Sequence, residues 1–128
     1  MRYTLSLLAF AFLIFTAQSG EAVEVLHTYD SMKDDTQELA SQYPDIAIYS
    51  EQGMSTGLDL EIFSVDVALN ITELTDEELN ALPTMYVDGT HHGNEGMSAE
   101  ASFLFLKDVL ERSAADPSYL EGKRLVVT

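Results

Sequence analysis

The chain has 128 residues, enough for one domain of ordinary size or for part of a larger one. Its 22 acidic residues against 6 basic ones give a net charge of -16, which makes nucleic acids and anionic membrane surfaces poor partners because their phosphates would be repelled. With 46% hydrophobic residues and no cysteine, we expect a packed core and exclude disulfides and thiolate metal sites.

The first twenty residues differ from the rest of the chain. Arg2 gives a positive start, residues 5–15 are almost wholly apolar, and residues 17–20 are small or polar. This order is typical of a secretory signal peptide. The apolar run is shorter than the ~20 residues of a membrane-spanning helix, and a retained N-terminal anchor is the alternative. We therefore expect a secreted or extracytoplasmic domain over residues 21–128, with membrane contact only if residues 1–20 stay attached.

The mature part of the chain begins with a predicted helix over residues 28–42. Five residues fall at helical spacing: Tyr29, Met32, Thr36, Leu39 and Tyr43. The helix should end before Pro44, because the residue preceding a proline resists helical geometry.

Two strands and a glycine-bearing loop are predicted next. Residues 46–50 have a strand composition, and Gly53 and Gly57 mark a polar loop. Apolar residues alternate from Leu58 onward, but the phase shifts after Ile62. A β-bulge or burial of both faces would explain the shift, and the pair of strands suggests an antiparallel hairpin.

An acidic segment, residues 68–83, follows the hairpin. Within it Thr75 and Glu78 match a capping box, which predicts a short surface helix over residues 75–82. Residues 85–87 then predict a brief buried strand that ends at an Asp-Gly pair.

A second long helix is predicted over residues 95–113. Ala99, Phe103, Leu106 and Leu110 lie on one stripe that Ala101, Leu104 and Phe105 widen, which suits a helix lying on a sheet. A last strand starts at residues 125–127. The element order predicts an α/β fold with a mixed sheet and flanking helices. Because nothing downstream pairs with or covers the last strand, we expect the domain to be incomplete.

The segment that carries chemistry lies between the third predicted strand and the second long helix. Residues 88–95 read Asp-Gly-Thr-His-His-Gly-Asn-Glu. His92 and Glu95 are three residues apart, so at a helix start both side chains point to one side and can share one ion. Zn²⁺ suits an imidazole and a carboxylate. A glutamate in a first helical turn is also favoured by the helix dipole, and Asn94 could cap the helix, so a reading without metal stays open.

Residues 87–95 resemble the first zinc motif of the M14 family of metallocarboxypeptidases. The resemblance covers nearly all of residues 27–128: the opening helix with its Tyr43-Pro44 end, the strand turn around Ser55, and the helix after the motif. It implies a zinc-carboxypeptidase-like fold, a Zn²⁺ cofactor and a peptide or protein C-terminus as substrate. His92 and Glu95 then map onto the zinc ligands.

The same resemblance implies what this sequence does not contain. In the family the third ligand, a histidine, and the general base, a glutamate, lie well downstream. We therefore expect this chain to be an N-terminal piece, without peptidase activity alone, since His27 and His91 are poor substitutes. Asn94 occupies a substrate-binding position in some members. Leu58 stands where the family often has arginine, and residues 68–83 look like an insertion, which leaves the subfamily and substrate preference open.

Two other functions fit the same motif. The related aspartoacylase and succinylglutamate desuccinylase deacylases use a similar turn, although they reach it sooner after their start. A secreted, inactive domain that binds peptides or serves in assembly is the non-enzymatic alternative.

Overall fold

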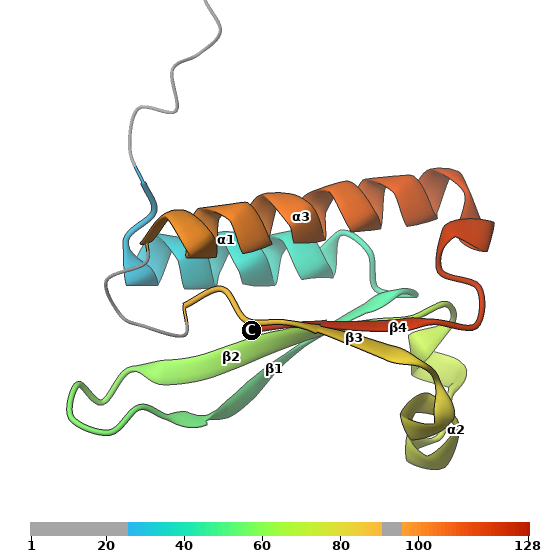
Figure 1. The fold of residues 1–128 in the computed structure, drawn as a ribbon, viewed down its shortest axis with the longest axis horizontal. Helices are drawn as coiled ribbons and strands as arrows, with labels where there is room; N and C mark the ends of the chain where they lie inside the picture. The colour runs from blue at the N-terminus through green and yellow to red at the C-terminus, as the bar shows by residue number, and fades with distance from the viewer. Residues whose placement is uncertain (1–25, 91–95) are drawn as a thin grey trace, which may run out of the picture.

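The computed structural model describes residues 26–90 and 96–128, so the predicted signal peptide or anchor lies outside the described residues (Figure 1). In chain order the elements are α1 (Tyr29–Ser41), β1 (Ala47–Met54), β2 (Glu61–Val67), the 3-10 turn η1 (Ile71–Glu73), α2 (Asp76–Ala81), β3 (Thr84–Val87), α3 (Gly96–Ala115), the 3-10 turn η2 (Pro117–Tyr119) and β4 (Arg124–Val127). The predicted α/β class, a mixed sheet with flanking helices, is confirmed.

The sheet has the strand order β1-β2-β4-β3, and α1 and α3 lie together over one of its faces (Figure 1). β1 pairs antiparallel with β2, and β2 pairs antiparallel with β4, whereas β3 and β4 are parallel. The parallel pair is joined through α3, as the long crossover of a βαβ unit requires. No helix in the described ranges is long and apolar enough to cross a bilayer.

The predicted hairpin is present, and its irregularity lies in the first strand. Glu51 pairs with Phe63 and Gly53 with Ile62, so Gln52 is the extra residue of a bulge opposite the predicted phase shift. The alternation that starts at Leu58 does not mark a strand there. Leu58 is 75% exposed and belongs to the loop before β2 begins.

One prediction about the last strands was wrong. β3 is an edge strand rather than a buried one, with Met85 58% and Tyr86 61% exposed, because β4 inserts between β2 and β3. β4 in turn has a partner on each side, and both partners precede it in the chain. Its alternation is that of a central strand, with Leu125 and Val127 buried toward the helices.

The core lies between the sheet and the two long helices. Its most buried side chains are Val65, Val67, Leu106 and Leu110. The apolar face of α3 is narrower than expected, because Leu104 is 58% exposed. Thr28 caps α1 in a reciprocal box with Ser31, so the helix begins where its first donors are satisfied.

Candidate functional site

The turn from β3 to α3 leaves the sheet at the carboxyl ends of its two parallel strands. Thr128 N donates to Val87 O at 2.9 Å, and Gly89 N donates to Thr128 O at 2.8 Å. The parallel ladder therefore continues one step beyond both strands before the chain turns toward α3. The edge beyond the carboxyl ends of parallel strands is where ligands bind in α/β folds.

Gly89 is the residue that lets this turn lie close against the fold. A Cβ at this position would lie 3.1 Å from Thr128 O and 3.2 Å from both Cβ and Oγ of Ser102. Ser102 itself is buried on α3. Only glycine therefore fits between the end of β4 and the helix without a shift of one of them.

Hydrogen bonds tie both sides of the turn to its neighbours. Thr90 N donates to Asp88 Oδ1 at 3.2 Å, a local turn that the Asp side chain supports. Ser98 Oγ, in the first turn of α3, donates to Gly89 O. The end of β3 and the start of α3 are thus joined directly, in addition to the chain that connects them.

The predicted ligands His92 and Glu95, together with Asn94 and His91, lie outside the described residues. Within residues 26–90 and 96–128 no group of three or more His, Cys, Asp or Glu side chains is arranged to hold a metal ion. The donor set of one imidazole and one carboxylate fits zinc by its chemistry, as two of the three protein ligands of a His₂Glu site.

A second cluster, which the sequence reasoning missed, lies at the same end of α3. His27 precedes α1, and its backbone N donates to Glu100 Oε1 at 2.5 Å. Its ring Nδ1 lies 2.9 and 2.8 Å from the two Glu100 carboxylate oxygens, and its Nε2 lies 2.9 Å from Asp35 Oδ2 on α1. We call these three residues the His27 cluster. Both ring nitrogens are already engaged, which argues against His27 as a further zinc ligand.

The pKa values follow from these contacts. The pKa of His27 is raised above its ordinary value of 6.5, chiefly by its hydrogen bond with Glu100 and also by the bond with Asp35, while burial partly offsets the rise. Burial by itself would raise the pKa of Glu100, but the bonds from the His27 backbone and ring outweigh it, so that this pKa is lowered. A signal was available in the sequence: Glu100 lies among the apolar residues of a helix that packs on a sheet, where an acidic residue needs a partner.

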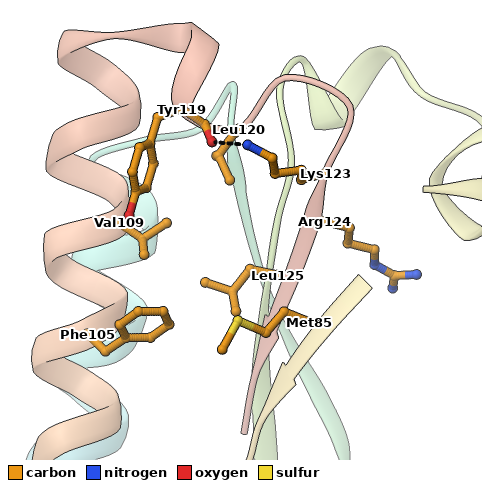
Figure 2. Close-up of a pocket in the computed structure, with 8 residues that line it drawn as sticks. All are labelled: Met85, Phe105, Val109, Tyr119, Leu120, Lys123, Arg124 and Leu125. Carbon is orange, nitrogen blue, oxygen red and sulfur yellow. Dashed lines mark hydrogen bonds between the residues drawn. The ribbon is translucent and has the colours of Figure 1, made fainter. Parts of the chain in front are cut away.

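An apolar groove of about 210 Å³ runs between α3 and the strands β3 and β4 (Figure 2). Its lining residues are Met85, Phe105, Val109, Tyr119, Leu120, Lys123, Arg124 and Leu125. Lys123 Nζ donates to Tyr119 O at 3.2 Å, and the Arg124 side chain points away from the groove (Figure 2). The groove thus lacks a cluster of reactive groups and offers mainly apolar surface.

The Arg124 side chain lies on the opposite face of the sheet and forms hydrogen bonds there. Its Nε donates to Asp66 Oδ1 at 2.6 Å across β2 and β4, and its Nη1 donates to Asn80 Oδ1 at 2.9 Å. Arg124 and Asp66 border a shallow hollow of about 290 Å³ together with Tyr86 and Thr128. The Thr128 hydroxyl donates a hydrogen bond to the Tyr86 hydroxyl at 2.7 Å. This face is mixed in polarity and satisfies its own hydrogen bonds.

Comparison with known proteins gives a likeness of fold. No protein-family model matches the chain, and no curated protein matches it. Among solved structures the chain is similar to thrombin activatable fibrinolysis inhibitor (TAFI), a protein with the carboxypeptidase fold, with a TM-score of 0.65 and 16% identity over 80% of this chain. The chain spans 24% of the length of that protein. The described residues therefore have a carboxypeptidase-like fold.

Proposed function

We propose that this chain carries part of the active site of a secreted, zinc-dependent metallocarboxypeptidase. In this proposal His92 and Glu95 are two of the zinc ligands, Asn94 contacts the substrate, and the substrate is the C-terminus of a peptide or protein. The proposal assigns the remaining ligand, the residues that bind the substrate carboxylate and the general base to none of these 128 residues.

The observation that supports the proposal most is the position of the turn in the fold. The segment that resembles the family's zinc motif lies in sequence between β3 and α3, and its described residues 88–90 lie beside the carboxyl end of β4. The same chain has a carboxypeptidase-like fold by comparison with TAFI. A motif of loose spacing gains weight when it falls at the edge where α/β folds bind ligands.

Zinc, when bound, would polarise the scissile carbonyl and lower the pKa of a bound water. Residues on both sides of the turn fix its position against the rest of the fold. Gly89 allows it to approach the helix, and Ser98 ties its beginning to the start of α3. The segment that contains His92 and Glu95 would thereby be held at both of its ends, which would limit the movement of the two ligands at a metal site.

Zinc titration of the full chain by calorimetry tests the ligands. We expect weak but measurable binding, because only two protein ligands are present. His92→Gln or Glu95→Gln should weaken zinc binding at least about tenfold, since even changes in residues that only hydrogen-bond to the ligands cost that much at metal sites. His91→Gln is the matched control and should leave affinity within about threefold. Equal affinities of the His91 and His92 variants would count against the assignment.

Substrate assays separate the proposed enzyme classes. The chain alone should show no peptidase activity, because neither the third ligand nor the general base is present. A chelator-sensitive rate on a C-terminal dipeptide substrate would overturn that expectation. In a protein that contains the missing residues, hydrolysis of peptides but not of acyl-amino acids favours the carboxypeptidase over the deacylase. The absence of both rates would favour a binding domain.

A further inference from the structure

The geometry of the His27 cluster specifies the charge of its imidazole. Both ring nitrogens lie 2.8–2.9 Å from carboxylate oxygens, Nδ1 at Glu100 and Nε2 at Asp35. Ionised carboxylates only accept hydrogen bonds, so both ring nitrogens must donate. Only the doubly protonated imidazolium has two N–H groups.

We propose that His27, as an imidazolium, is a pH-dependent latch that fastens the start of α3 to α1 and to the segment before α1. The latch joins residues far apart in sequence, since Glu100 lies 73 residues after His27. The carboxylate that it binds on α3 is buried, since Glu100 is only 9% exposed. Loss of one ring proton leaves one ring nitrogen facing a carboxylate with no N–H between them. Either the half-exposed Asp35 then loses its ring donor, or the buried Glu100 keeps only the donor of the His27 backbone.

In the described part of the chain, the side chains that face the His27 ring come from α3 and α1. From α3 the ring faces Glu100 and the Phe103 ring, whose centroid lies 5.2 Å away. From α1 it faces Asp35, which is half exposed. Among the described residues, the charges that act on the ring are the two carboxylates, and both favour its protonated form.

The pH range of the latch follows from the signs of the two shifts. The raised pKa of His27 means that its contribution is complete below its ordinary value of 6.5 and is lost as the pH rises through the folded value. The lowered pKa of Glu100 means that its contribution is complete above its ordinary value of 4.5 and is lost as the pH falls through the folded value. The latch is therefore fully closed between pH 4.5 and 6.5, and it opens above the raised pKa of His27 and below the lowered pKa of Glu100.

If the proposed function holds, the latch also affects the turn that would carry the zinc ligands. α3 begins at Gly96, directly after Glu95, and Leu26 approaches Gly96 beside the latch. An open latch would loosen the helix start that follows the proposed ligand. The latch itself is independent of zinc and is tested without it.

Nitrogen-15 NMR of the imidazoles in the metal-free full chain is the direct test. We expect the His27 ring, identified as the signal lost in His27→Gln, to be doubly protonated at pH 6 and to titrate above 6.5. Glu100→Gln should lower that pKa most and Asp35→Asn less, while Asp34→Asn, an exposed carboxylate one residue away, should leave it unchanged. If the Glu100 variant does not fold, the exposed Asp35 variant still gives the test.

Hydrogen exchange supplies the conformational readout. Protection of the amides of residues 100–103 should fall as the pH rises through the His27 titration, by about tenfold for each unit by which that pKa exceeds its ordinary value. In His27→Gln this step should disappear, after correction for intrinsic exchange. A singly protonated ring at pH 6, or the same step in His27→Gln, would overturn the latch. A normal latch with no zinc binding would instead refute only the proposed function.

Discussion

Gly89 is the residue whose identity the turn requires most directly. The space for a side chain is closed by the carbonyl of Thr128 and by Ser102 of α3, at 3.1 and 3.2 Å from the Cβ that another residue would add. Neither neighbour is the end of a flexible side chain, so the helix or the last strand would have to move. The close contact is thus a property of the fold and not of the metal.

We expect Gly89→Ala to destabilise the chain by about 1–3 kcal/mol, the usual cost of overpacking. Urea unfolding of the metal-free chain measures it. Gly96→Ala is the control, because the nearest atom to its added Cβ is Leu26 Cδ1 at 3.9 Å. It should be neutral or stabilise by up to about 1 kcal/mol, since alanine is the better helix former. A Gly89 variant as stable as the parent would show that the packing around the turn is loose.

The elements were predictable where a local rule acts alone. Thr75 and Glu78 form the capping box that the sequence indicated, and α2 begins beside it. The helix before Pro44 ends at Ser41, close to where the proline rule placed its end. Such features depend on a few neighbouring residues, and the sequence contains all the information they need.

The predictions failed for features that depend on a contact with residues distant in the sequence. The burial of β3 depends on which strand lies beside it, and periodicity does not reveal that β4 inserts next to it. The pairing of Glu100 with His27 spans 73 residues, so no window of sequence shows it. The zinc motif was found from its resemblance, and its ligands remain a prediction because they lie outside the described residues.

At the level of one element, the cap of α1 gives a separate prediction. Thr28 Oγ1 accepts from Ser31 N at 3.2 Å, and Ser31 Oγ accepts from Thr28 N at 2.9 Å. Thr28→Ala should cost about 0.5–2 kcal/mol of stability in a thermal or urea melt, because it leaves helix donors unsatisfied. Thr56→Ala, on the exposed hairpin loop, should change stability by less than about 0.5 kcal/mol. Equal effects of the two changes would contradict the capping role.

The described part of the molecule is a sheet with two long helices on one face and with β1 and β3 as its edge strands. The likeness to TAFI covers 80% of this chain and 24% of that protein, so most of that protein has no counterpart here. The exposed edge has apolar side chains, Met85 and Tyr86, beside the apolar groove between α3 and the strands. Such an edge is a template for pairing with another chain.

We therefore expect concentration-dependent association through β3, which Met85→Lys should reduce because a lysine on an edge strand opposes pairing. Light scattering at fixed concentration and salt measures it. Met97→Lys adds the same charge at another exposed methionine, 70% accessible on α3. An added lysine makes the net charge of -16 less negative, which weakens the repulsion between chains. If net charge alone controlled association, both variants would therefore associate more. A chain that stays monomeric, or equal effects of the two lysines, would contradict association through the β3 edge.

In the proposed zinc site, one imidazole and one carboxylate of the turn share a single ion. X-ray absorption at the zinc edge of the zinc-loaded full chain distinguishes its ligands, because imidazole gives a characteristic scattering pattern. We expect one imidazole at ~2.0–2.1 Å with oxygen ligands completing the shell, and loss of that imidazole in His92→Gln but not in His91→Gln. A spectrum that is unchanged in His92→Gln would contradict it.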